Sequence, residues 1–271
     1  MPSGVMAGMA GVARALLVAL FLAAPAGSAR ALDAERGCPT AEAPIVTDRP
    51  DVTNSSLVVP LGSLQVENGI NGAVRRDAGR IDGTNTRLRL GVFGCTELVL
   101  DVPTWSGAVT GRGASGFTNL SPGVKHQLGP LPGDIDLSIA AGLGLPTGAR
   151  RIAGPGPQPY LQFPWSRELA GGWGVSGMLT TFWLPERAGS DALLENNVVL
   201  SRELTETTEL FVEFVGDYPH DRRPQQLVNM GGAWRVTPTQ QLDVHGGFGV
   251  DRETPRWFVG IGYSFRYDRL F

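Results

Sequence analysis

The sequence contains few of the residues that build metal and redox sites. Its 271 residues include 2 Cys and 3 His, and Lys125 is its only lysine. His126, His220 and His245 lie far apart and are not predicted to share a face, so their spacing does not match a metal site. The sequence therefore predicts no metal site and no cofactor.

Long apolar runs and sustained helical periodicity are also missing beyond residue 31. No run there reaches the roughly 18 apolar residues of a transmembrane helix. Glycine is abundant instead, with 37 residues, about twice the ordinary usage, and there are 20 prolines. The mean hydropathy of −0.02 suits strands that alternate apolar and polar residues. The composition is that of an all-β, turn-rich protein.

Residues 1–31 have the pattern of a secretory signal peptide. Arg14 precedes an apolar run from Ala15 to Ala24, and a small-residue site follows at Ala29-Arg30-Ala31. Removing Arg14 and Arg30 changes the formal charge from −3 to −5. We expect an exported protein in the cell outer membrane, and the charge argues against nucleic acid as a partner.

Alternation of apolar and polar residues recurs along the rest of the chain. The sequence predicts an antiparallel transmembrane β-barrel over residues 63–271, preceded by a periplasmic N-terminal segment over residues 32–62. The twelve expected strands are 63–76, 84–93, 96–106, 117–128, 134–146, 158–167, 172–184, 194–203, 207–218, 225–236, 240–250 and 256–267.

The connections between these strands fall into two length classes. Short turns are expected at 94–95, 129–133, 169–171, 204–206 and 237–239, and longer loops at 77–83, 107–116, 147–157, 185–193 and 219–224. This asymmetry is typical of outer-membrane barrels and places both termini on the periplasmic side. The six Trp fall near the strand ends, three at each side, as two interfacial belts require. Aromatic packing in a β-sandwich is the alternative.

The last strand is apolar on one face and ends close to an aromatic terminus. Tyr263, Phe265 and Tyr267 share the apolar face, and Phe271 is the final residue. We expect this face to contact outer-membrane lipid. The four aromatics are predicted to form the signal by which the barrel-assembly machinery recognises the chain.

Several stretches resemble an outer-membrane transporter family named for the meta-pathway of phenol degradation. TDRPD (47–51) precedes Pro60, Gly62, Ser63, Gln65 and Glu67, which match P-x-G-S-x-Q-x-E, and LRLGVFGCTELVLDVP, GLGLPTG and WFVGIGYSFRY also match. The resemblance covers about residues 45–271 and departs at Cys95. It implies a β-barrel that transports small solutes, possible substrates being aromatic or other apolar compounds.

The expected lumen face carries most of the charged residues of the strands. The lumen-lining candidates are Glu67, Arg87, Arg89, Asp101, Asp136, Glu195, Glu209, Glu213, Asp243, His245 and Arg266. A barrel of this size can hold a channel or a plug. We expect the N-terminal segment to fold inward, so that Asp48, Arg49 and Asp51 pair with lumen charges. A solvated periplasmic linker is the alternative.

The two cysteines fall at the expected periplasmic side. Cys38 lies in the N-terminal segment and Cys95 in a short turn. Because the periplasm is oxidising, a disulfide between them is expected, and two unpaired thiols are the alternative. Closing this loop would lower unfolded-state entropy by an amount worth about 4 kcal/mol.

The sequence favours a passive outer-membrane channel for uptake or efflux of small solutes, which is not an enzyme. A structural barrel with an occluded lumen is one alternative. A barrel-embedded hydrolase is another, because Ser264 and His245 are expected on adjoining strands and on the same face. The sequence does not indicate the oligomeric state.

Overall fold

The computed structural model describes residues 37–271 except 76–77, 112, 187–188, 221 and 253. The predicted signal peptide and residues 32–36 lie outside the described residues. The elements are β1 (Leu64–Arg75), β2 (Ala78–Phe93), β3 (Thr96–Asp101), β4 (Trp105–Ala108), β5 (Gly116–Phe117), β6 (Ser121–Leu131), β7 (Ile135–Gly144), α3 (Arg150–Ala153), β8 (Gln158–Leu169), β9 (Trp173–Glu186), β10 (Gly189–Thr205), β11 (Thr208–Pro219), β12 (Gln225–Thr237), β13 (Gln240–Gly249) and β14 (Trp257–Tyr267).

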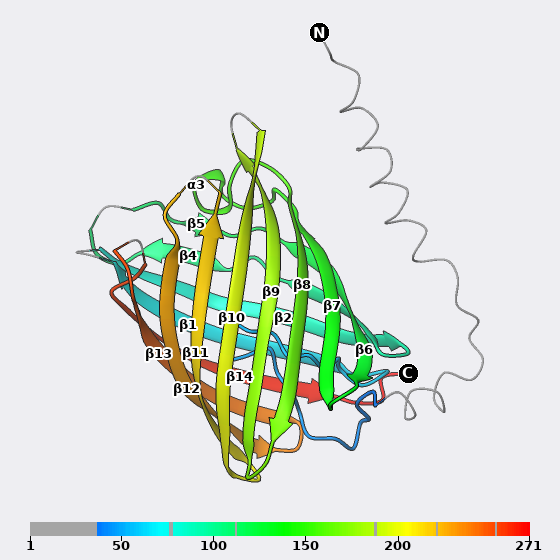
Figure 1. Ribbon diagram of the computed structural model, residues 1–271. Helices are drawn as coiled ribbons and strands as arrows, with labels where there is room; N and C mark the ends of the chain where they lie inside the picture. The colour runs from blue at the N-terminus through cyan, green and yellow to red at the C-terminus, as the bar shows by residue number, and fades with distance from the viewer. Residues whose placement is uncertain (1–36, 76–77, 112, 187–188, 221, 253) are drawn as a thin grey trace.

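The strands close into one antiparallel barrel (Figure 1). The hydrogen-bonded order runs from β1 through β14 and back along the chain to β3 and β2, and β2 pairs again with β1. At the seam, β1 pairs with β14 from Leu64↔Tyr267 to Val74↔Trp257. The closed ladder satisfies backbone groups that lipid could not, which is what a membrane-spanning sheet requires. The predicted barrel of twelve wall strands is confirmed.

Two of the twelve wall strands are interrupted, which is why fourteen strand segments form them. β3 pairs with one half of β2 and β4 with the other half. Pro103, between β3 and β4, has no N–H to donate to a ladder. β5 and β6 follow the same path on the next wall strand, because β5 pairs with β4 and β6 with β3.

Two of the predicted long loops are instead extended hairpins. β2 begins at Ala78, so most of the loop predicted at 77–83 is strand, paired with β1 as far as Arg75↔Ala78. The described residues of the loop predicted at 185–193 likewise belong to the β9–β10 ladder, which is paired as far as Gly189↔Glu186. Pairing there is made by the backbone. The sequence does not alternate between apolar and polar residues in these two segments, because neither face of the strands has to contact lipid there. The prediction relied on alternation and therefore missed them.

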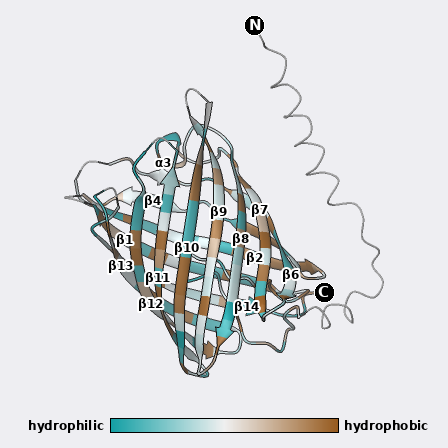
Figure 2. Ribbon diagram, in the orientation of Figure 1, coloured by the Kyte–Doolittle hydropathy of each residue, from teal (hydrophilic) through white to brown (hydrophobic). Residues whose placement is uncertain are grey.

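Apolar and polar residues alternate along many of the strands (Figure 2), and exposure places the apolar ones outside the barrel and the polar ones inside. Outward side chains such as Ile70, Val244 and Ile261 are 49%, 53% and 60% exposed. The largest fully buried side chains are mostly polar or charged, including Arg89, Lys125, Gln65, Glu67, Glu97 and Glu213. In the part of the chain that the structure describes, no helix is both long enough and apolar enough to cross a membrane.

Candidate functional site

The interior of the barrel holds the segment that precedes β1. We call residues 38–60 the inner segment. In Figure 1 its blue trace runs among the strands, toward the end of the barrel where the C-terminus lies. Inward-facing side chains of the wall bond it at many positions, namely Asp48, Arg49, Val52, Thr53, Asn54, Ser56, Val58 and Val59.

Asp48 lies at the centre of a buried charge cluster. Its carboxylate is 3.0 Å from Arg87 Nη1, 3.3 Å from Arg89 Nη1 and 3.3 Å from Lys125 Nζ. Its backbone N–H donates to the Glu67 carboxylate at 3.0 Å. Burial alone would raise the pKa of Asp48, but the three cations outweigh burial and hold the pKa well below its usual range. Asp48 is therefore ionised at neutral and mildly acidic pH.

The wall around Asp48 is close to neutral by itself. Three cations face three wall carboxylates in the pairs Arg89–Glu67 (3.1 Å), Arg89–Glu97 (3.0 Å), Lys125–Glu97 (3.1 Å) and Arg87–Asp101 (2.6 Å). Lys125 and Glu97 were not among the predicted lumen residues. Their signal was present, because Lys125 alternates with His126 on β6 and Glu97 shares the phase of Asp101 on β3.

Arg49 joins the inner segment to the strands at the seam. Its Nη2 lies 3.1 Å from Asp243 Oδ1 on β13 and 3.4 Å from the carbonyl oxygen of Ile261 on β14. Gly69 on β1 and Gly262 on β14 leave the space that the guanidinium fills, since a Cβ on either would overlap it. These two glycines on the inner face therefore make room for the Arg49 guanidinium.

Glu213 on β11 holds the turn that follows Asp51. Its carboxylate accepts the N–H of Val52 at 2.9 Å, the N–H of Thr53 at 2.9 Å and the Thr53 hydroxyl at 2.8 Å. Asn229 Nδ2 donates to the same carboxylate at 2.9 Å. Asp51 is not in an ion pair with any other described residue. Burial and the nearby Glu213 charge raise the pKa of Asp51 well above its usual range.

The remaining hydrogen bonds attach the inner segment to successive strands of the wall. Asn54 Nδ2 donates to Gln162 Oε1 on β8 at 3.0 Å, the hydroxyls of Ser56 and Ser166 are 2.7 Å apart, and the Val59 N–H donates to Glu97 at 2.6 Å. The segment thus passes from β13 by way of β11 and β8 to β3. Its contacts are directional and polar along this path.

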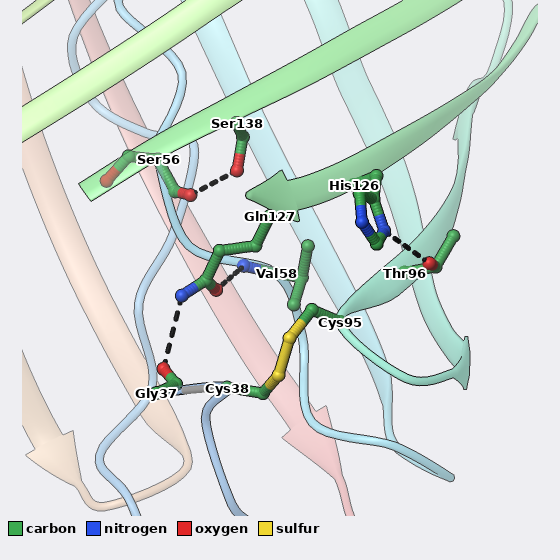
Figure 3. The surroundings of a disulfide bond; sticks show 9 residues. All are labelled: Gly37, Cys38, Ser56, Val58, Cys95, Thr96, His126, Gln127 and Ser138. Carbon is green, nitrogen blue, oxygen red and sulfur yellow. Dashed lines mark hydrogen bonds between the residues drawn. A yellow bond between two sulfur atoms is a disulfide. The ribbon is translucent and has the colours of Figure 1, made fainter. Parts of the chain in front are cut away.

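A disulfide ties the start of the inner segment to the β2–β3 turn (Figure 3). It joins Cys38 to Cys95, and Val58, near the end of the inner segment, is buried beside it. Gln127 on β6 accepts the Val58 N–H at 3.4 Å and donates to the Gly37 carbonyl oxygen at 3.1 Å. Both ends of the inner segment are therefore fixed at the same place on the wall.

Arg266 on β14 holds the first residues of the inner segment. Its Nη2 donates to the carbonyl oxygens of Ala43 at 2.8 Å and Ala41 at 3.1 Å, and its Nε lies 2.7 Å from Asp268 Oδ1. Other predicted lumen residues make no hydrogen bond or ion pair with the inner segment among the described contacts. They are Asp101, Asp136, Glu195, Glu209 and His245, of which Asp101 pairs with Arg87 on the wall and His245 lies 3.2 Å from both Asn71 and Asn229.

Three of the four aromatic residues predicted as the insertion signal lie on the outer face of β14. The rings of Tyr263, Phe265 and Tyr267 follow one another with centroids 5.7 and 5.4 Å apart. Phe271 lies beyond the strand and is 66% exposed. Their recognition by an assembly machinery remains a prediction.

The structure does not bring Ser264 and His245 together as a nucleophile and base. On the β13–β14 ladder, His245 pairs with Gly260, whereas Ser264 pairs with Gln241. The two side chains are therefore four residues apart along the strands, beyond hydrogen-bond reach. The pair that the hydrolase alternative required is absent from the described residues.

A cavity of 730 Å³ lies along β1 and β11–β14. The apolar side chains that line it include Ile70, Leu210, Trp234, Val244 and Ile261, all of which are exposed on the outer face of the barrel. The cavity is therefore a groove on the outside of the wall, separate from the lumen.

The model of the family described as "Putative MetA-pathway of phenol degradation" matches residues 47–267, from the start of the TDRPD stretch to the end of β14. No curated protein matches the chain.

Two solved structures share the architecture. An outer membrane channel from Pseudomonas putida F1 superposes with a TM-score of 0.63 at 13% identity, over 82% of this chain and 100% of that chain. The NanC porin superposes with a TM-score of 0.53 at 8% identity, over 74% of this chain and 98% of that chain. Identities this low establish the fold, which is that of outer-membrane barrels.

Proposed function

We propose that the chain, which belongs to this phenol-degradation family, is a passive outer-membrane channel for small solutes, including aromatic compounds. The observation that carries the proposal is an apolar wall around a polar interior that holds a tethered inner segment. Ion pairs and hydrogen bonds attach this segment, so it can shift without breaking an apolar core. Its position would set the aperture.

The outer surface supports a setting in lipid. Trp105, Trp183 and Trp257 are 43%, 41% and 49% exposed, and Trp173 and Trp234 are 44% and 51% exposed. Each lies near a strand end, where an indole ring reaches the headgroup zone with its N–H. Outer-membrane lipid and the barrel-assembly machinery are the partners that this proposal includes.

Solute flux into liposomes tests the channel directly. Liposomes that contain the refolded mature protein are expected to take up polar solutes such as sugars and amino acids faster than empty liposomes. Polar solutes decide the question because small aromatic compounds leak through bare lipid. Flux equal to that of empty liposomes would contradict an open channel. It would favour a structural barrel with an occluded lumen, which the filled interior also suits.

Mild acid is expected to lower the conductance. The raised pKa of Asp51 means that its ionised form opposes docking of the inner segment at neutral pH. As the pH falls through that raised pKa, Asp51 takes up a proton, the penalty disappears and docking strengthens. Single-channel conductance should therefore decrease as the pH falls from above to below the raised pKa of Asp51. Asp51→Asn, which keeps the size and removes the charge, should abolish this decrease, and an equal decrease in the variant would refute the assignment to Asp51.

A further inference from the structure

A second polar cluster lies on the wall formed by β10 and β11. Glu195 on β10 is paired directly with Asp217 on β11, so their carboxyl groups lie side by side on the inner face of the wall. Asn197, two residues further along the same face of β10, donates its Nδ2 to Glu195 Oε1 at 3.1 Å. The ion pairs of the described residues include none of these three side chains.

Two buried oxygen atoms of this cluster lack a partner. Asn197 is 0% exposed, and its Oδ1 accepts no hydrogen bond within the described structure. Asp217 Oδ1 is also buried without a partner. Buried polar atoms are almost always satisfied by protein, water or an ion. Because both atoms are acceptors, the group that completes the cluster must be a donor or a cation.

The neighbouring carboxylate of Glu213, in contrast, has hydrogen-bond partners. It accepts from two backbone N–H groups, one hydroxyl and one amide, as described above. On this part of the wall, among the described residues, the unmet acceptors are Asn197 Oδ1 and Asp217 Oδ1. This contrast separates the cluster from the contacts that dock the inner segment.

A shared proton would not complete the cluster. Two carboxylates at directly opposite positions repel each other unless a proton or a cation lies between them. A proton between Glu195 and Asp217 would satisfy that one contact. It would leave Asn197 Oδ1 and Asp217 Oδ1 unsatisfied, whereas a cation beside the two carboxyl groups can bind Asp217 Oδ1 and, after rotation of the Asn197 amide, Asn197 Oδ1 as well.

We propose that Glu195, Asp217 and Asn197 form a binding site for a hard divalent cation of the Ca²⁺ class on the lumen wall. Carboxylate and amide oxygens are the ligands that Ca²⁺ prefers, and the two carboxylates balance its charge. No three His, Cys, Asp or Glu side chains in the described ranges group as a metal site. The third protein ligand is therefore the Asn197 amide, and lumen water completes the coordination.

Calorimetric titration of CaCl₂ into the refolded mature protein, stripped of metal by a chelating resin, tests the site. The wild-type protein should show saturable binding of one Ca²⁺ per chain. Asn197→Leu, which removes Oδ1 at similar volume, should weaken binding at least about tenfold, and Glu195→Gln with Asp217→Asn should remove it. Glu209→Gln is the matched control, because it neutralises another inward acid of β11 and should leave the affinity unchanged.

Three outcomes would overturn the proposal. The first is no saturable binding to the wild-type protein up to about 10 mM Ca²⁺, which exceeds the weakest range of natural calcium sites and would mean that water or a proton fills the cluster. The second is unchanged binding in the double variant. The third, measured on the wild-type protein alone, is affinity that does not fall from about pH 8 to about pH 5, because protons must compete for these carboxylates. The heat-dependent gel shift of a folded barrel verifies each variant.

Discussion

Deletion of residues 38–60 is expected to raise the single-channel conductance several-fold. The deletion removes the chain that passes through the lumen from β13 to β3, and water would replace it. The wall should survive the loss, because the cations around Asp48 already face wall carboxylates in equal number. These groups are Arg87, Arg89 and Lys125 on one side and Glu67, Glu97 and Asp101 on the other. Planar-bilayer recording of the refolded barrel measures the effect.

The deletion also removes Cys38, so Cys95→Ser is included to avoid a free thiol. The matched control is the full-length Cys38→Ser/Cys95→Ser variant, which lacks the disulfide and keeps the inner segment. Its conductance should stay near that of the wild-type protein, because the ion pairs of Asp48 and Arg49 remain. Equal conductance of the deletion variant and this control would show that the conducting path avoids the space that the inner segment fills.

Replacing Asp48 by Asn should release the inner segment while leaving its length intact. Asp48 contacts Arg87, Arg89 and Lys125, and the side chains of Arg89 and Lys125 are 0% and 2% exposed. Loss of one partner from a buried ion pair costs about 3 kcal/mol. That is about two orders of magnitude in the undocked population. The open probability and the rate of proteolysis within the inner segment should both increase.

Glu42→Gln is the control for Asp48→Asn, because it also removes one negative charge from the inner segment. Glu42 pairs with Arg269 at 2.8 Å, but the side chains are 70% and 78% exposed. Exposed pairs contribute little, so neither readout should change. An Asp48→Asn variant that resists protease and opens as rarely as the wild-type protein would contradict the role given to the cluster.

Asp48 and Asp51 should respond to pH in opposite directions. The pKa of Asp48 is lowered when the inner segment is docked. The stabilisation that its ionised carboxylate gives to docking is therefore complete above the usual aspartate pKa and is lost only at more acidic pH. The docked pKa of Asp51 is raised, so its penalty applies at neutral pH and is relieved by mild acid. Of these two aspartates, only Asp51 is expected to change its contribution in mild acid, which is why Asp51→Asn is the informative variant.

The strands could be predicted because lipid and lumen impose opposite demands on alternating residues. Leu88 and Leu90 alternate with Arg87 and Arg89, so the phase of β2 was readable from its residues. The start of β2, the last residues of β9 and the start of β10 were missed because beyond the membrane neither face must be apolar. Asp48, Arg49 and Asp51 were proposed as lumen contacts, but the sequence could not assign their partners.

The partners depend on strands far apart in the chain. Asp48 meets Lys125, 77 residues later in the chain, only because the inner segment folds against the wall that β2, β3 and β6 form. The sequence shows Gly69 and Gly262 only as small residues on the inner face. The structure shows that they leave room for the Arg49 guanidinium. Asn197 carries no signal of its own, since only its burial beside Glu195 shows that Oδ1 lacks a partner.

The sequence by itself determined the class of fold, the number of wall strands and the face of each strand that meets lipid, because a period of two is a local property of the chain. The tertiary structure decided how the inner segment is held and where acceptors are left unmet. Those features depend on which strands closure makes neighbours and on how much water the inner segment excludes, and neither is encoded in any one stretch of residues.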